Sequence, residues 1–142
     1  MIDNASFSAT TDAHEAALQS WVELAARLLL SLIFLLSGLG KLGAYSATAA
    51  YMSSAGVPGA LLPLVIATEV LGALAVMLGW KTRMAAFLVA GFSLLSAICF
   101  HHNFANQMEM IQFLKDTSIA GGFLLLVANG AGRRSIDRRR AA

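Results

Sequence analysis

Four long apolar stretches constrain this chain more than any other feature of its sequence. They cover residues 21–42, 61–80, 84–100 and 110–128. Each is close to the length of about twenty helical residues that crosses roughly 30 Å of bilayer hydrocarbon. Backbone polar groups in lipid must form hydrogen bonds inside the protein, and a helix achieves this within its own segment. None of the four stretches alternates polar and apolar residues as the strand of a membrane barrel does. The sequence therefore predicts an all-α fold, a bundle of four transmembrane helices.

The composition agrees with lipid as the solvent of this chain. Hydrophobic residues make up 58% of the sequence and charged residues only 13%, whereas soluble domains carry about 25% charged residues. The mean hydropathy is +0.70. A length of 142 residues allows one domain. We divide it into an N-terminal segment (1–20), a membrane domain (21–130) and a basic tail (131–142). The expected main partner of the chain is the lipid bilayer.

The N-terminal segment is acidic and contains no lysine or arginine. It lacks the basic region of a cleaved signal peptide, so we expect the first apolar stretch to be retained. Asp12 followed by Glu15 resembles a capping box. This pattern predicts that a helix begins at Asp12, in or under the lipid headgroups, and continues into the membrane.

The positive charges outside the apolar stretches predict an orientation. They lie at Lys81 and Arg83, between the second and third stretches, and in the tail, which holds five arginines. In a four-span topology both places fall on one side, and short loops rich in lysine and arginine stay in the cytoplasm. We expect both termini to be cytoplasmic. Basic tails are common beside membrane spans, so we expect no nucleic-acid partner.

The connections predict hairpins between successive spans. Residues 43–60 are uncharged and rich in glycine, serine and alanine, with turn residues at 56–59. Residues 81–83 form a tight basic turn, and residues 101–109 form a polar loop. Cys99 is the only cysteine, so no intramolecular disulfide is possible.

Ionisable residues inside the spans are the most informative side chains. A charge near the bilayer centre costs at least about 2.5–3.5 kcal/mol, so it persists where it pairs, reaches water or serves a function. Glu69 is the deepest, because every other residue from 42 to 80 is uncharged. The helical rise places most of the ionisable set in the outer half of the bundle. We predict an internal polar cluster formed by Arg27, Lys41, Glu69, His101, His102, Lys115 and Asp116.

Two interpretations of this cluster remain open. Its members could be ion pairs that fix the helix register, with Glu69 paired to Lys115 or reached from below by Arg27. They could instead line a pocket for a polar headgroup, a quinone or a proton. One of the two adjacent histidines, His101 or His102, would face inward.

Other chemistry has little support in the sequence. Cys99, His101, His102 and Glu109 are metal-ligand types, but adjacent histidines on a helix point in different directions, and we predict no metal site. There is no phosphate-binding glycine loop, no zinc-protease motif and no motif for covalent haem. The serines of the apolar helices, Ser37 among them, are expected to bond to carbonyls one turn back. We expect no catalytic activity from this chain alone.

The order of motifs resembles that of the DoxX family over residues 24–128. The motifs are an arginine-led, leucine-rich helix that ends near a lysine (27–42), an intramembrane glutamate followed by glycines (69–79), an aromatic–histidine pair (100–101) and a charged pair before two glycines (115–122). Asp116 replaces the asparagine more usual in the family and adds a charge.

The resemblance implies a four-helix protein of the bacterial inner membrane, associated with redox systems. Our leading hypothesis is an accessory or anchoring subunit of a quinone-linked complex, with redox-enzyme subunits as partners and quinone as a ligand that is not covalently bound. The alternative is a small carrier or channel for a lipid, solute or proton, which four spans could form as a homo-oligomer. A third possibility is an assembly protein whose charges only set helix packing.

Overall fold

The computed structural model describes the backbone of residues 4–141 and the side chains of residues 12–140. The helices in chain order are α1 (Asn4–Gly43), α2 (Tyr45–Ser54), the short 3₁₀ helix η1 (Gly59–Leu61), α3 (Leu62–Leu78), α4 (Thr82–Phe100), α5 (Gln107–Asn129) and α6 (Ile136–Ala141). No strand occurs in this part of the chain. Four helical segments are long and apolar enough to cross a membrane: Asp12–Gly43, Gly59–Leu78, Thr82–Phe100 and Gln107–Asn129. The predicted all-α bundle of four transmembrane helices is confirmed.

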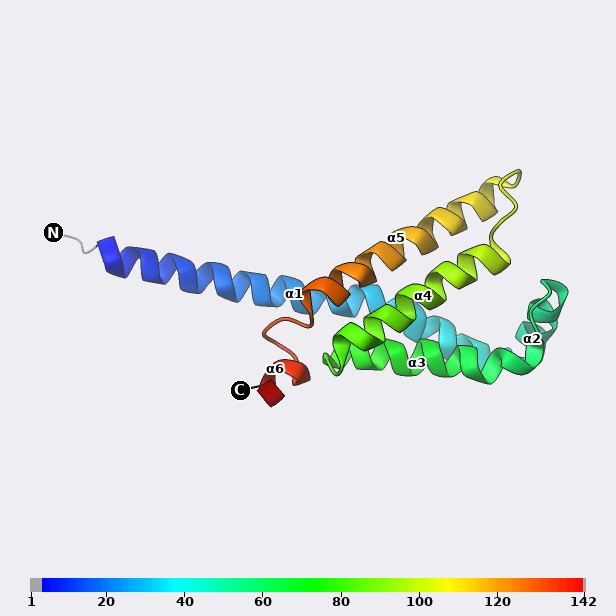
Figure 1. The fold of residues 1–142 in the computed structure, drawn as a ribbon, viewed down its shortest axis with the longest axis horizontal. Helices are drawn as coiled ribbons and strands as arrows, with labels where there is room; N and C mark the ends of the chain where they lie inside the picture. Colours follow the sequence, from blue (N-terminus) through cyan, green and yellow to red (C-terminus); the bar gives the residue numbers. More distant parts are fainter. Residues whose placement is uncertain (1–3, 142) are drawn as a thin grey trace.

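The bundle consists of two helix pairs. α1 packs along α3, and α4 packs along α5, while α1 and α5 make few contacts. The pairs join at the tight turn between α3 and α4, and these two helices separate as they run away from that turn (Figure 1). We call the end with the α3–α4 turn and α6 the terminal end, and the end with α2 the far end. The separation leaves space between the two pairs at the far end.

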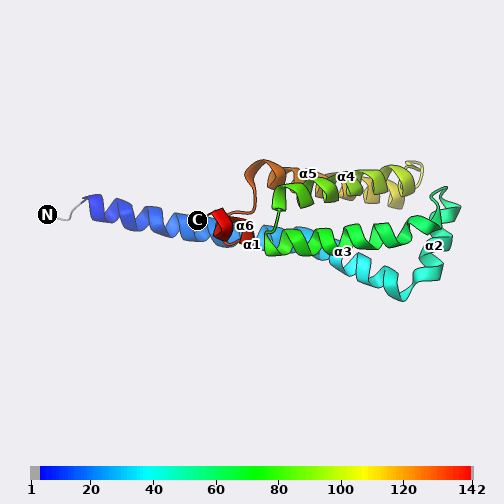
Figure 2. The ribbon, with the colours of Figure 1, turned by 60° about the horizontal axis from the view of Figure 1, so that its bottom comes forward.

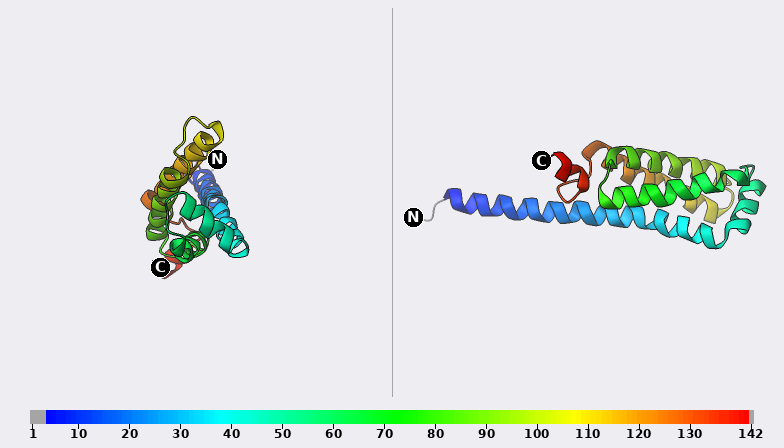
Figure 3. Two further views of the ribbon diagram at one scale, coloured as in Figure 1. Left: turned by 90° about the vertical axis from the view of Figure 1, so that its right-hand side faces the viewer. Right: turned by 90° about the horizontal axis from the view of Figure 1, so that it is seen from below.

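The first helix is much longer than a membrane span. Its 40 residues correspond to about 60 Å, roughly twice the hydrocarbon thickness. Its N-terminal part extends beyond the bundle at the terminal end (Figures 2 and 3). The helix begins at Asn4, so the prediction of a start at Asp12 was wrong. Residues 4–11 contain no glycine or proline, and nothing in them stops the helix that the later residues favour.

The connection between the first two spans contains a helix that the sequence analysis missed. α2 follows α1 after a break at Ala44 and lies across the far end of the bundle (Figure 2). Its Met52 is buried against Leu62 and Ile66 of the second span. The predicted turn follows it, with Gly56 in the left-handed region at φ +80°. This uncharged linker is therefore packed onto the bundle, with Met52 as its buried side chain.

Small residues and aromatic rings fill the core between the helix pairs. Phe34 packs edge-on against Phe123 and Phe92, with ring centroids 5.5 Å and 6.3 Å apart. Gly38 brings α1 close to α3, because a Cβ atom there would lie only 2.7 Å from Val70 Cγ2. Many large apolar side chains face outward instead, such as Leu29 with 72% of its surface exposed. This arrangement suits a lipid surrounding.

The basic tail is folded onto the terminal end. Asp137 caps α4, since the backbone N–H groups of Lys81 and Thr82 donate to its carboxylate at 2.7 Å and 2.8 Å. The N–H of Asp137 donates to the Gly79 carbonyl at 2.8 Å. Burial alone would raise the pKa of Asp137, but these hydrogen bonds and the charge of Arg140 lower it on balance.

Arg27 connects α1 to the folded tail at the terminal end. Its side chain is fully buried and donates to the carbonyls of Val76 and Arg134. Gly79 has φ +69°, and a Cβ atom there would collide with the Arg27 guanidinium. Arg134 in turn lies over the Trp21 ring, 3.6 Å from its centroid. The basic tail is therefore part of the packed structure.

Candidate functional site: a polar cavity between the helix pairs

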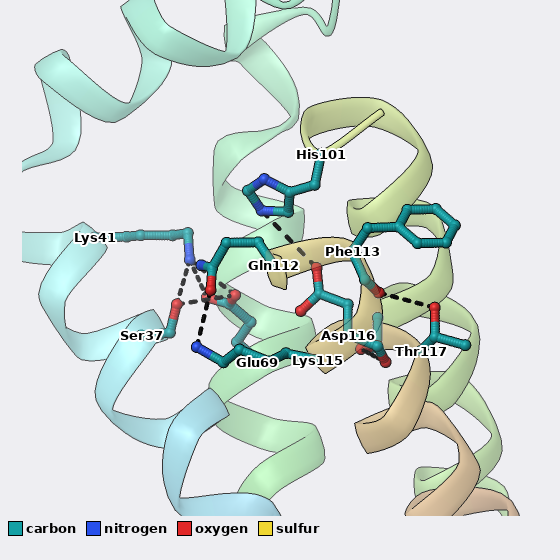
Figure 4. A network of polar contacts seen from close by, with 10 residues as sticks. Ser37, Lys41, Glu69, His101, Gln112, Phe113, Lys115, Asp116 and Thr117 are labelled. Carbon is teal, nitrogen blue, oxygen red and sulfur yellow. Dashed lines mark hydrogen bonds and ion pairs between the residues drawn. The ribbon is translucent and has the colours of Figure 1, made fainter. Parts of the chain in front are cut away.

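An ion pair joins the two helices of the first pair near the far end. Lys41 Nζ lies 2.8 Å from each carboxylate oxygen of Glu69 and donates to Ser37 Oγ at 2.6 Å. Ser37 Oγ donates to Glu69 Oε1 at 3.3 Å (Figure 4). Ser37 and Lys41 are one helical turn apart and share a face of α1, and Gly38 on the next position lets that face reach α3. The charge of Glu69 is thus balanced inside the bundle.

A second, looser pair faces it from the other two helices. His101 Nε2 lies 3.8 Å from Asp116 Oδ2 (Figure 4). This distance is too long for a hydrogen bond. Asp116 Oδ2 is buried and has no hydrogen-bond partner among the described side chains. Ser93 Oγ on α4 donates to the Asp116 backbone carbonyl at 2.9 Å, which fixes this part of α5. The pair therefore keeps an unused acceptor.

Both pairs line one cavity of about 460 Å³, which we call the polar cavity. Volumes of about 300–1,000 Å³ are usual for small-molecule sites, which combine apolar walls with a few polar groups. Its polar lining includes Ser37, Lys41, Thr48, Tyr51, Glu69, Ser93, Ser96, His101, Gln112 and Asp116, and its apolar lining includes Phe34, Phe92 and Phe100. All four spans and α2 contribute. α2 closes the far end through Thr48, Tyr51 and Met52.

Four of the seven residues of the predicted cluster meet at this cavity, namely Lys41, Glu69, His101 and Asp116. His101 is the inward histidine, whereas His102 is exposed. Lys115 is also exposed and donates to Gln112 Oε1 at 2.8 Å. The partner of Glu69 is Lys41, so the expected pairing with Lys115 or Arg27 was wrong.

The position of Arg27 explains why it takes no part in the cavity. Arg27 and Lys41 are 14 residues apart on α1, which is about 21 Å along the helix axis. Glu69 packs beside Gly38, close to Lys41. The guanidinium of Arg27 instead meets carbonyls at the terminal end. Counting residues along α1 already places Arg27 far from Lys41. The packing shows that Glu69 lies at the level of Lys41 and out of reach of Arg27.

Several cavity residues were not anticipated. Ser37 and Ser93 were expected to bond to carbonyls of their own helices, but both bond to other helices. The spacing of Ser37 and Lys41 on one helical face could have revealed the first contact. Tyr51 reaches the cavity from α2, where its ring stacks on Phe100 at 5.7 Å. No pattern in the sequence marked that position. Among the described side chains no group of three metal-ligand types is close enough to hold a metal ion.

These features define a class: a small multi-pass membrane protein with a polar cavity between two helix pairs. The model of the DoxX family matches residues 22–102. The chain is 48% identical over 115 residues to the inner membrane protein YqjF of Escherichia coli (strain K12), covering 81% of this chain and 88% of that protein.

A second relative gives the same result. The inner membrane protein YphA of Escherichia coli (strain K12) is 40% identical over 123 residues, covering 82% of this chain and 88% of that protein. The chain therefore belongs to the DoxX family and is a multi-pass protein of the bacterial inner membrane. No solved structure matches it.

Proposed function

We propose that this protein is an accessory membrane subunit of a redox complex and that its polar cavity binds the headgroup of a quinone. One observation carries the proposal. The Lys41–Glu69 ion pair of α1 and α3 and the facing side chains of His101, at the end of α4, and Asp116 of α5 line the same space of about 460 Å³. Ion pairs that served only to fix helix register would be expected to close the space between them with packed side chains.

The chemistry of the lining suits both redox states of a quinone. A quinone has two carbonyl oxygens that accept hydrogen bonds, and the ammonium of Lys41 would donate to one of them in place of its present bond to Ser37 Oγ. A quinol has two hydroxyl groups that donate, and the unpartnered Asp116 Oδ2 is an acceptor. The imidazole of His101 can donate or accept a hydrogen bond. Phe34 and Phe92 supply an apolar wall for the ring.

The long first helix supports the accessory role. The part of α1 before Ser20 extends beyond the bundle (Figure 3), and Leu18 there is 63% exposed. A charged helix with an exposed leucine, continuous with the membrane anchor, offers a partner subunit a place to bind.

Quinone retained during mild-detergent purification tests the binding. We expect wild type to retain quinone, and Glu69→Gln and Asp116→Asn to retain at least about tenfold less, a binding loss of about 1.4 kcal/mol. Lys115→Gln is the control, because its side chain is exposed outside the cavity. Equal quinone contents in wild type and both cavity variants would contradict the proposal.

Affinity capture tests the partner. Full-length protein should bring down a redox subunit from solubilised membranes, and a variant with Leu18→Asp should lose it while keeping its quinone. Retention of the same subunit by this variant would exclude the helix extension as the binding surface.

The packing below the cavity disfavours the alternative of a channel. Between the polar cavity and the terminal end, the core is filled by Phe34, Val89, Ala86 and Phe123, none more than 7% exposed. A path for a solute or proton would have to open through these side chains. Flux into liposomes that contain the purified protein separates the two functions, because the accessory subunit should give none.

A further inference from the structure

A second hollow lies along the outside of α3 and α4. It is a groove of about 720 Å³, lined almost entirely by apolar side chains, which we call the lateral groove. Its lining runs from Val57 and Leu61 at one end to Trp80 and Lys81 at the other. α3, which forms one wall, has 17 residues, so the groove is roughly 26 Å long. It therefore extends over most of the hydrocarbon thickness.

The lateral groove and the polar cavity share a boundary. Val57, Val65, Phe92 and Leu95 line both spaces. α3 and α4 separate toward the far end (Figure 1). Closer to the terminal end the helices touch, since a Cβ atom on Gly72 would lie 2.6 Å from Val89 Cγ2. The contact between the two spaces is thus confined to the far half of the bundle.

We propose that the lateral groove holds the isoprenoid tail of the quinone and that the gap between Val65 and Phe92 is the doorway through which the headgroup enters from the bilayer. This inference rests on the proposed function. A long-tailed quinone is dissolved in the hydrocarbon, so it must approach the polar cavity from the side and keep its tail in an apolar surrounding. The lateral groove provides that surrounding directly outside the cavity.

The boundary residues suit a doorway. Phe92 is half-buried, packs edge-on against Phe34 on the cavity side, and forms part of the groove wall on the other. A change of its side-chain rotamer would join the two spaces without moving a helix. Leu95 is 63% exposed, so its side chain can turn aside without displacing any neighbour.

The position of the doorway favours a quinone tail over a phospholipid chain. A phospholipid keeps its charged phosphate at the membrane surface, whereas the doorway includes Phe92, about midway along α4. A headgroup without a permanent charge enters at the depth of Phe92 at a lower desolvation cost than a phosphate does. A benzoquinone ring is such a headgroup.

Binding in lipid nanodiscs tests the inference with two probes, ubiquinone with a long isoprenoid tail and the same ring with no tail. We expect wild type to bind the tailed quinone at least about tenfold more tightly than the tail-less ring, because the groove buries the tail. Leu95→Trp should fill the doorway and remove this preference, because the tail of a bound quinone could no longer pass from the polar cavity into the lateral groove.

A neighbouring residue supplies the control. Leu94→Trp makes the same change on α4 at a position that lines neither space, and it should keep the preference. Val65→Trp fills the doorway from α3 and replaces Leu95→Trp if that variant fails to fold. Equal affinity of wild type for the two probes, or an undiminished preference in both doorway variants, would overturn the inference and leave the headgroup site intact. If neither probe binds to wild type, the proposed function is overturned as well.

A tailed quinone that carries a photoreactive group at the end of its tail locates the occupied surface. We expect it to label groove residues such as Met84 and Leu88. Labelling confined to the outer face of α5, at residues such as Leu125, would place the tail elsewhere and refute the inference. A groove filled by a second copy of the chain would give chain-to-chain cross-links in the absence of quinone and no labelling of these residues, which would also refute it.

Discussion

The ammonium of Lys41 lies 2.8 Å from both carboxylate oxygens of Glu69, joining the end of α1 to the middle of α3. The side chain of Glu69 is only 5% exposed and that of Lys41 is 24% exposed. A carboxylate in this position is tolerated because its charge is balanced within hydrogen-bonding distance. The pair forms one wall of the polar cavity and also fixes the register of α1 against α3.

This relationship predicts a strong coupling between the two residues. Lys41→Met should leave Glu69 buried without its partner and lower the free energy of unfolding by about 3 kcal/mol. The double variant Lys41→Met with Glu69→Met should lose less than the sum of the two single variants. Reversible unfolding in mixed micelles measures all four proteins. Additive losses would show that the pair contributes no coupling.

The close approach at Gly38 predicts a position-specific effect of adding one methyl group. Gly38→Ala should destabilise the protein by about 1–3 kcal/mol, because its Cβ would press on Val70 and displace α1 from α3. Gly40→Ala is the matched control on the same helix, since nothing lies within 4 Å of a Cβ there. It should stabilise the helix by about 0.5–1 kcal/mol. Thermal unfolding of the two variants side by side measures the difference, and equal effects would contradict the packing.

The lowered pKa of Asp137 predicts how the hydrogen bonds between Asp137 and the start of α4 respond to pH. A carboxyl group whose pKa is lower in the folded state stabilises that state above its unfolded pKa of about 3.9. The stabilisation is lost as the pH falls through the lower, folded pKa. Asp137→Asn should therefore speed hydrogen exchange at the Lys81 and Thr82 amides at neutral pH. The difference from wild type should shrink under strong acid, whereas a pH-independent difference would exclude the carboxylate charge as its cause.

The clustering of positive charge at the terminal end predicts the orientation in the membrane. Lys81, Arg83 and the arginines of the tail are exposed there, and such residues remain in the cytoplasm. In a Cys99→Ala background, Phe104→Cys should react with an impermeant maleimide in intact spheroplasts. Arg139→Cys should react only after the membrane is permeabilised. The reverse pattern would place both termini outside.

Much of the architecture follows from the sequence because insertion into lipid depends on local properties. Each span is apolar over enough residues to cross the hydrocarbon by itself, whatever its neighbours are. The depth of Glu69 and Asp116 also follows from counting residues at a constant rise, which is why both were expected in the outer half of the bundle. The helix α2 was missed because its residues carry no charge and no long apolar run, and only contact with the bundle buries Met52.

The partners of the buried charges were decided by the tertiary structure. Helical depth narrows the choice of partner for Glu69, but the rotation of each helix and the spacing between helices select Lys41 over Lys115 and Arg27. The same rotation turns His101 toward Asp116 and leaves His102 exposed. Hydropathy along the chain thus determined the four spans and the charges they contain. The packing of α1 on α3 and of α4 on α5 decided which charges meet and that a cavity remains between them, because side-chain contacts depend on angles and distances between helices that no single segment encodes.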